Sequence, residues 1–337
     1  MISGQTNATS GQAILNWALS PGISFEFSKS YQQTPPSISS LFSIPISVAG
    51  SLFYDDRAGM FVPVLLITGG NPGIRQQSQS EDRFRLSIGN NGGGVRIAGS
   101  VTYVISKTDN PLLSFSNPSA LVEASVPTLF VRDDGGRLIQ YDARSFSGKA
   151  RTSSRFLADI HLFGSFPGKA TERRAEPDRH SGANWDLNIA YEFAVKDRIT
   201  LEDGQRSLDI LTTPLSLAPA ALARHRLTLH AAVAGDTYGI NIGGSWQSRF
   251  RGASIDDIRS PVSFSSLMVL NAEGFIDLGR AREQSRASKI RIKLAIDNMF
   301  SRRVRNLASL QPRERGISGS LLDPLGRVVR LSVRKVF

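Results

Sequence analysis

The sequence predicts an all-β fold: a transmembrane, antiparallel, up-and-down β-barrel. Three observations lead to this prediction. Apolar and polar residues alternate in about ten segments, no long segment has helical periodicity, and the connections between the segments alternate between long and short. Alternation with a period of two gives a strand one apolar and one polar face. Long loops at one end and tight turns at the other are typical of transmembrane barrels.

The alternation is clearest at 185–195, where Trp185, Leu187 and Ile189 begin a series of apolar residues interleaved with polar or small ones. A segment of this length is a complete strand with one apolar face. The same pattern predicts strands around 15–19, 23–27, 84–88, 95–105, 156–162, 227–233, 238–246, 270–278, 290–296 and 329–337.

The connections sort by length. Tight or short links lie at 20–22, 90–94, 234–237 and 279–287, and longer ones at 32–79, 106–153, 196–225, 249–264 and 299–327. Only 164–184 does not fit the alternation. A soluble sandwich or jelly roll also has many alternating strands, but it does not generally sort its loops in this way. Charged residues in the middle of strands, such as Arg96 and Asp186, favour a barrel with a polar lumen.

Composition limits the alternatives. The 337 residues, 40% of them apolar, suffice for a folded core, and we expect 1–337 to form a single domain. The absence of cysteine excludes disulfides, thiol catalysis and Cys-ligated metals. The net charge of +11 comes from scattered basic residues that do not cluster with aromatic ones, so nucleic-acid binding is not expected.

The segments that could target or anchor the chain are short. The longest apolar run, MFVPVLLI at 60–67, falls well below the roughly 18 residues that a membrane helix needs, so we expect any crossing to be made by strands. The N-terminus, MISGQTNATSGQAIL, lacks the basic start and apolar stretch of a signal peptide. We therefore expect either a protein that is not exported or a chain that is not a complete precursor.

The C-terminal segment DPLGRVVRLSVRKVF alternates up to its last residue. Val329, Leu331, Val333 and Phe337 share one face, which Lys335 interrupts. Terminal residues of a soluble domain usually fray, so a strand that remains regular to the end suggests that this terminus has a function.

Several motifs, in chain order, resemble the TonB-dependent receptor family. KIRIKLAIDNMFSRRVRN, with Asn298 and Phe300 at its corner, and GRVVRLSVRKVF, ending on Phe337, are similar to that family's ending. NWALSPGISFEFSKSYQQTPPSISSLF resembles its tryptophan-bearing strand, turn, strand and Pro-Ser segment. ITGGNPGI, containing Gly69, Gly70, Asn71 and Pro72, resembles its Gly-Gly-Asn-Pro loop, although Ile74 and Gln76 or Gln77 replace the usual Leu and acidic residue. VRDDGGRLIQYDAR resembles another of its loops.

The resemblance implies the C-terminal half of a 22-stranded barrel in the outer membrane of a Gram-negative bacterium. It implies TonB-driven uptake of a scarce nutrient such as a ferric siderophore, cobalamin or an oligosaccharide. The implied partners are the TonB complex, through a plug domain that is not in this chain, the barrel assembly machinery, through the C-terminal strand, and outer-membrane lipid and lipopolysaccharide. Two alternatives stay open: a self-standing small pore or adhesin barrel, which ten strands could close, and a soluble β-sandwich binding module.

The sequence contains no catalytic constellation, so we expect no enzyme activity, cofactor or metal. The four histidines, His161, His180, His225 and His230, lack metal-ligand spacing, and we expect His161 and His230 to face a polar lumen. The paired carboxylates at 55–56, 133–134 and 256–257 are predicted to be solvated turns rather than calcium sites. GISGS at 316–320 lacks the strand-to-helix setting of a nucleophile elbow.

An arginine-rich loop is the candidate ligand site. By the sorting of the loops it is extracellular, where guanidinium groups could bind an anionic ferric chelate or lipopolysaccharide phosphates, although a merely solvated loop explains it equally well. Its residues are Arg302, Arg303, Arg305, Arg313 and Arg315. Six aromatic residues fall near strand ends or in strand interiors, and interfacial girdle positions explain several of them more simply than ligand stacking does: Trp17, Trp185, Trp246, Tyr31, Tyr191 and Tyr238.

Overall fold

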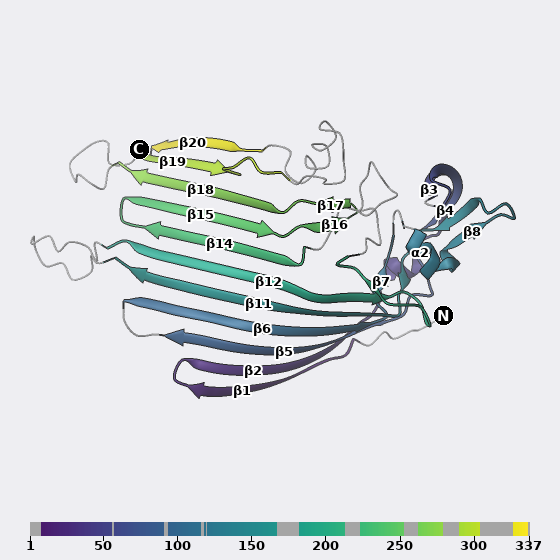
Figure 1. The fold of residues 1–337 in the computed structure, drawn as a ribbon, viewed down its shortest axis with the longest axis horizontal. Helices are drawn as coiled ribbons and strands as arrows, with labels where there is room; N and C mark the ends of the chain where they lie inside the picture. Colours follow the sequence, from purple (N-terminus) through teal and green to yellow (C-terminus); the bar gives the residue numbers. More distant parts are fainter. Residues whose placement is uncertain are drawn as a thin grey trace, which may run out of the picture.

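A wide sheet of long strands carries a smaller folded body at one end in the computed structural model (Figure 1). The structure describes residues 8–55, 57–90, 94–115, 118, 120–166, 182–212, 223–252, 262–278, 290–303 and 326–335. Within these ranges, no helix is both long enough and apolar enough to cross a membrane.

The wide sheet, which we call the main sheet, is an up-and-down meander. Eleven strands lie in chain order, each antiparallel to the next, and the short β13 (Leu208–Asp209) pairs with the side of β12. The eleven are β1 (Ser10–Ser20), β2 (Ile23–Thr34), β5 (Gln77–Asn90), β6 (Val95–Asp109), β11 (Ala150–Ser165), β12 (Asn184–Thr200), β14 (His225–Ala234), β15 (Tyr238–Gln247), β18 (Leu267–Asp277), β19 (Ile290–Asp297) and β20 (Val328–Lys335).

The predicted all-β antiparallel fold is confirmed. Each predicted alternating segment overlaps one of these strands, and the structure has eleven of them where about ten were expected, the C-terminal strand included. Within the described part of the chain β1 and β20 do not pair with each other, so the main sheet is open there and does not close on itself as a ten-stranded barrel would.

The connections sort to opposite ends of the main sheet, as predicted. The links β1–β2, β5–β6, β11–β12, β14–β15 and β18–β19 lie at one end, which we call the turn end, and the other five lie at the long-connection end. The ambiguous link at 164–184 belongs to the turn end, because β11 and β12 pair directly up to Ser165 and Asn184. The tightest turn needs Gly22, which has a φ of 86°.

The long connections were expected to be loops, and this expectation was wrong most clearly for those at 32–79 and 106–153. They contain a four-stranded sheet in the order β3 (Ile46–Asp55), β4 (Met60–Thr68), β9 (Leu138–Asp142) and β8 (Phe130–Arg132), which we call the small sheet. It has its own apolar core, formed by Phe53, Val62, Val64, Leu138 and Tyr141. Burial of alternate residues in the run MFVPVLLI explains why this segment is a strand.

Short elements complete the long-connection end. They are α1 (Ile38–Phe42), β7 (Leu112–Leu113), α2 (Ala120–Ser125), the 3₁₀ helix η1 (Pro127–Leu129), β10 (Phe146–Ser147), β16 (Phe250–Gly252) and β17 (Val262–Phe264). Ser37 caps α1 by accepting a hydrogen bond from the Ser40 N–H at 3.1 Å. A second apolar cluster, including Val122, Val126 and Leu201, packs near α2.

Candidate membrane belt and ligand-facing surfaces

One face of the main sheet is an apolar belt. The strand register aligns apolar residues in rows across it, for example Trp17 with Phe25, and Leu294 with Leu331. These side chains are not covered: Trp17 near one edge is 64% exposed and Leu331 near the other is 69% exposed. A contiguous apolar surface of this width needs a nonaqueous environment or a partner.

An aromatic row forms the boundary of the belt toward the long-connection end. Successive strand pairs align Phe27, Phe84, Tyr103, Phe156 and Phe193. Two neighbouring pairs in the row have rings in contact, with centroids 5.0 Å apart for Phe27 and Phe84 and 4.5 Å apart for Tyr103 and Phe156. Aromatic girdles occupy this position at the interfaces of membrane barrels.

Beyond the aromatic row, the next residues on this face of β2 and β5 are charged. Lys29 and Asp82 follow Phe27 and Phe84 on the same face of β2 and β5 and form an ion pair of 3.1 Å.

The width of the apolar belt can be measured along β12. From the aromatic row toward the turn end, its apolar series extends from Phe193 to Trp185, eight residues or about 26 Å along the strand at ~3.3 Å per residue. A strand tilted by about 40° would project this to about 20 Å, close to the ~25 Å apolar band of membrane barrels.

The opposite face of the main sheet is polar and contains ion pairs. Glu192 on β12 lies between Arg155 of β11 and Arg226 of β14, at 3.9 Å from each. Lys293 on β19 pairs with Glu273 on β18 at 2.7 Å. Neighbouring strands thus place charges of opposite sign side by side, which suits a wet lumen.

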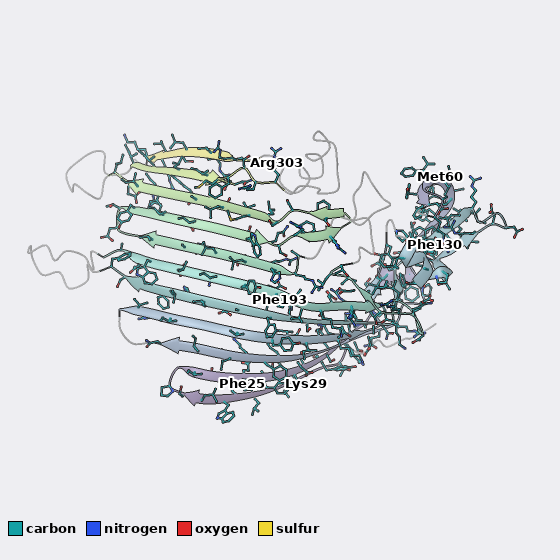
Figure 2. All side chains as sticks on the ribbon, viewed as in Figure 1. Phe25, Lys29, Met60, Phe130, Phe193 and Arg303 are labelled. Carbon is teal, nitrogen blue, oxygen red and sulfur yellow. The ribbon has the colours of Figure 1, made fainter. Side chains whose placement is uncertain are left out.

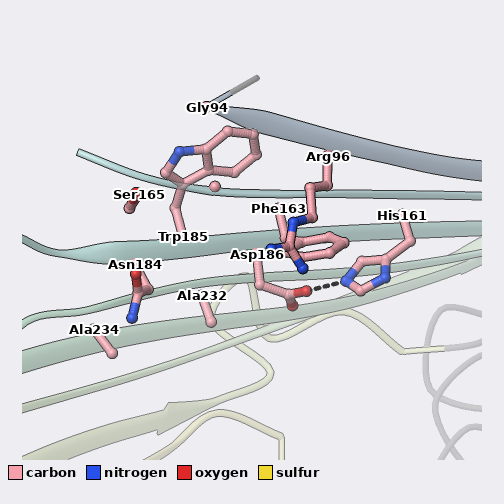
Figure 3. A pocket seen from close by; sticks show the side chains of 11 residues that line it. Gly94, Arg96, His161, Phe163, Ser165, Asn184, Trp185, Asp186, Ala232 and Ala234 are labelled. Atoms are coloured by element: carbon pink, nitrogen blue, oxygen red, sulfur yellow. Dashed lines mark hydrogen bonds and ion pairs between the residues drawn. The ribbon is translucent and has the colours of Figure 1, made fainter. Parts of the chain in front are cut away.

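A pocket of about 600 Å³ lies on this polar face at the turn end (Figure 3). Asp186 contacts His161 Nε2 and lies 3.2 Å from His230 Nδ1, and Arg96 lies over the Phe163 ring at 5.4 Å. His161 and His230 therefore share the polar face, as expected, while His225 stacks on Phe193 at 4.7 Å. No cluster of three or more potential metal ligands occurs within the described ranges. His180 lies outside them.

Arg132 organises a buried ion cluster that joins the small sheet to α2. Its guanidinium donates to both carboxylate oxygens of Asp55 at 2.8 Å and to those of Glu123 at 2.7 and 2.8 Å. Arg57 reaches Glu123 at 3.4 Å. The Asp55 side chain is 1% exposed, so the predicted solvated turn at 55–56 is wrong for Asp55. Asp56, Asp256 and Asp257 lie outside the described residues.

The electrostatics of this cluster follow from the same contacts. Hydrogen bonds from Arg132 hold the pKa of Asp55 below its ordinary value, against the opposing effect of burial. The two carboxylates, Glu123 first, raise the pKa of Arg132. The ion pair between Arg132 and Asp55 joins strand β8 to the end of β3.

The Gly-Gly-Asn-Pro motif forms a backbone corner. Gly69 has a φ of 110°, and a Cβ there would lie 2.5 Å from the Ile44 carbonyl oxygen. The Asn71 side chain donates to the Ser145 carbonyl at 2.9 Å and accepts from the Gly73 N–H at 2.9 Å. Because the Asn71 N–H also donates to the Ser40 carbonyl at 2.8 Å, Asn71 connects α1 to the segment after β9.

Asn298 also closes a corner. It is 3% exposed with a φ of 47°, and its side chain accepts from the Arg302 N–H and donates to the Arg302 carbonyl, both at 2.9 Å. Phe300 in the same corner is 51% exposed. This turn ends β19 and directs the chain into the long connection.

The predicted arginine site is described only in part. Arg302 and Arg303 are exposed and follow β19 at the long-connection end, where Figure 2 labels Arg303. Arg305, Arg313 and Arg315 lie outside the described residues, as do GISGS and Phe337. Two features were missed from the sequence: the aromatic row, which an alignment of the segments on their tight turns would have revealed, and the Arg132 cluster, whose residues lie far apart in the chain.

Comparisons with known proteins give a fold but no family. No family model matches the chain, and no curated protein matches it. Among solved structures, the siderophore receptor PirA from Acinetobacter baumannii aligns with a TM-score of 0.56 at 10% identity, over 97% of this chain and 41% of that one. The ferric enterobactin receptor mutant Q482A from Pseudomonas aeruginosa, PfeA, in complex with enterobactin, aligns with a TM-score of 0.50 at 12% identity, over 87% and 35%.

The chain therefore spans less than half the length of these receptors. Its main sheet has the antiparallel up-and-down fold of part of an outer-membrane barrel receptor. At 10% and 12% identity the likeness concerns the fold alone.

Proposed function

We propose that the chain is a C-terminal barrel portion of an outer-membrane, TonB-dependent receptor that takes up a scarce nutrient. The apolar belt of the main sheet carries this proposal, because it ends at an aromatic row and lies opposite a face of paired charges. Such a surface is unfavourable in water and favourable in a bilayer. The structural neighbours support the same proposal, since one is a siderophore receptor and the other a ferric enterobactin receptor.

The proposed substrate is an anionic ferric siderophore, with cobalamin and oligosaccharides as the alternatives. The exposed Arg302 and Arg303 support this choice, since guanidinium groups bind anionic oxygens well. In this proposal a plug domain that is not in this chain contacts TonB, and the C-terminal strand contacts the barrel assembly machinery. The barrel portion alone binds but does not perform energised transport.

Fractionation of expressing Gram-negative cells tests the membrane part of the proposal. We expect the chain in the outer-membrane fraction, with heat-modifiable migration after detergent extraction. Full solubility without detergent would instead favour the β-sandwich module. A self-standing pore or adhesin is the second candidate, and it would be favoured if the purified chain conducted ions in planar bilayers and bound none of the three nutrients.

Ligand binding tests the substrate part. Outer membranes carrying the chain are titrated with ferric enterobactin and, separately, with cobalamin. We expect a double variant, Arg302→Ala with Arg303→Ala, to weaken binding of the ferric chelate about tenfold and to leave binding of cobalamin unchanged. A tenfold loss of affinity corresponds to the loss of roughly one charge-assisted hydrogen bond. If the unsubstituted chain and the double variant bound the ferric chelate equally well, Arg302 and Arg303 would not be part of the ligand site.

A further inference from the structure

Two basic residues of β12 lie on the belt side of the main sheet, beyond the aromatic row. In order from that row, the pairs between β11 and β12 are Phe156 with Phe193, Ser154 with Lys196, and Thr152 with Arg198. Positions two apart on β11 share a face, and residues paired across two strands lie on the same face. A register shift next to Ser154 changes the alternation of β12, which places Lys196 and Arg198 on the face of the apolar belt.

The position of Arg198 along the strand is close to the headgroup layer of a bilayer that the belt would span. On β11, its neighbour Thr152 is four residues beyond Phe156, which is about 13 Å along the strand at ~3.3 Å per residue. A strand tilted by about 40° would project this to about 10 Å beyond the aromatic row. The headgroup layer is roughly 5–7 Å thick, and the long arginine side chain can reach back into it.

Arg198 also lines a pocket of about 530 Å³ at this end of β12. Arg206, in the connection that follows β12, lines the same pocket together with the hydroxyl-bearing Ser207 and Thr212. Leu121 of α2 supplies an aliphatic part of the wall. Guanidinium and hydroxyl groups beside an aliphatic surface suit a ligand that combines an anionic group with an apolar part.

The protein does not neutralise the two arginines of this pocket. Within the part of the chain that the structure describes, Arg198 and Arg206 are exposed and form no side-chain hydrogen bond or ion pair. Asp209, the strand neighbour of Arg198 on β13, has other partners: it accepts a hydrogen bond from the Leu211 N–H at 3.0 Å and lies 3.7 Å from the Arg224 guanidinium. The pocket therefore keeps an excess of positive charge, which attracts an anion.

We propose that Arg198 and Arg206 bind the phosphate monoester headgroup of a lipid in the membrane leaflet at the long-connection end. A phosphate monoester carries up to two negative charges and three acceptor oxygens, so it can accept hydrogen bonds from both guanidinium groups. Ser207 and Thr212 add hydroxyl groups that can donate to the same oxygens. A lipid is the source of the phosphate because the basic residues continue the face of the apolar belt. This inference rests on the proposed membrane location and concerns a site separate from the proposed siderophore site.

Titration of the detergent-solubilised chain with short-chain lipids tests the inference. The chain is extracted from the membranes of expressing cells, and calorimetry measures binding of dihexanoyl phosphatidic acid, whose headgroup is a phosphate monoester. Dihexanoyl phosphatidylcholine has the same tails without this headgroup, and inorganic phosphate is the anion without tails. We expect phosphatidic acid to bind more tightly than either of the other two.

Substitution of the arginines assigns the binding to this pocket. We expect the pair Arg198→Gln with Arg206→Gln to weaken binding of phosphatidic acid about tenfold, which corresponds to the loss of roughly one charge-assisted hydrogen bond. Arg137→Gln, at an exposed arginine of the small sheet, is the matched control and should leave binding unchanged. The pair Arg198→Lys with Arg206→Lys keeps both charges and should bind more tightly than the glutamine pair, a comparison that holds even if the glutamine pair folds poorly.

Three results would overturn the inference. The first is equal binding of phosphatidic acid by the unsubstituted chain and both double variants. The second and third are binding of phosphatidylcholine, or of inorganic phosphate, as tightly as phosphatidic acid, because the site would then not recognise a lipid phosphate monoester. Absence of the chain from the membrane fraction would instead reject the proposed function.

Discussion

Individual residues act mainly at the corners and in the ion cluster of the long-connection end. Gly69 and Asn298 both adopt positive φ angles. A side chain at Gly69 would collide with the Ile44 carbonyl oxygen, whereas Asn298 closes its turn with its own side-chain amide. Both were noted in the sequence because of a family resemblance. Their geometry assigns them a structural role in directing the chain between sheets.

Replacing Gly69 by alanine tests its corner. We expect Gly69→Ala to lower the free energy of unfolding by about 1–3 kcal/mol, because the residue combines a φ of 110° with a Cβ position 2.5 Å from the Ile44 oxygen. Urea unfolding in detergent micelles measures the change. Gly11→Ala is the matched control, since nothing lies within 4 Å of a Cβ there; equal effects would refute the role assigned to Gly69.

Removing Arg132 leaves two carboxylates facing each other with little solvent. We expect Arg132→Ala to destabilise the small sheet by about 3–5 kcal/mol. This is the typical cost of removing one partner of a buried ion pair and leaving the opposite charge without compensation. Limited proteolysis measures this as faster cleavage within 44–68. The exposed Arg137→Ala serves as the control, and an unchanged cleavage rate in Arg132→Ala would show that the cluster does not stabilise the sheet.

The same cluster predicts a dependence on acid. The pKa of Asp55 in the folded state lies below the ordinary 3.8, so its stabilisation is complete above that value and is lost as the pH falls through the lowered pKa. We expect pepsin to cleave the small sheet increasingly as the pH falls below about 3.8. The Asp55→Asn variant should be cleaved by pepsin throughout this pH range. If the cleavage rate depended on pH identically in the unsubstituted protein and in Asp55→Asn, ionisation of Asp55 would not stabilise the small sheet.

Strands act through the alternation of their two faces. On β15, Ile242 belongs to the middle of the apolar belt, and its neighbour Asn241 belongs to the polar face. The register aligns such positions across the whole sheet, so the environment of one residue predicts that of its row. The apolar belt is therefore a property of the strands together rather than of any one of them.

A pair of arginine substitutions separates the two faces. We expect Ile242→Arg to cost about 2–4 kcal/mol, as for a charge near the bilayer midplane, whereas Asn241→Arg should cost little. Folding into phospholipid vesicles, monitored by heat-modifiable migration, measures both. A larger loss for Asn241→Arg would mean that the polar face, and not the belt, contacts lipid.

The whole molecule is asymmetric between its two ends. One end holds short turns at 20–23 and 234–238, and the other holds the small sheet and the ion cluster (Figures 1 and 2). Phe130 and Met60, labelled in Figure 2, belong to the small sheet. An asymmetric body inserts into a membrane in one orientation, with its large folded end on one side.

Protease access to intact cells tests this orientation. We expect added protease to cut an epitope tag inserted after Gly50, in the small sheet, and to spare the same tag inserted after Gly235, in the tight turn between β14 and β15. Disruption of the outer membrane should expose the second tag. Cleavage at Gly235 alone in intact cells would reverse the assignment of the two ends.

The sequence by itself determined the strands, their faces and the sorting of their connections, because these depend on local alternation with a period of two. It could not reveal the small sheet, whose parallel pairing of β4 with β9 joins residues such as Leu66 and Tyr141 across a long separation. Nor could it show that Asp55 meets Arg132, since that contact exists only once both long connections have folded together. Tertiary structure alone decided that β1 and β20 are the outermost of the described strands of the main sheet and that both run the same way, because strand order and direction are properties of the assembled sheet.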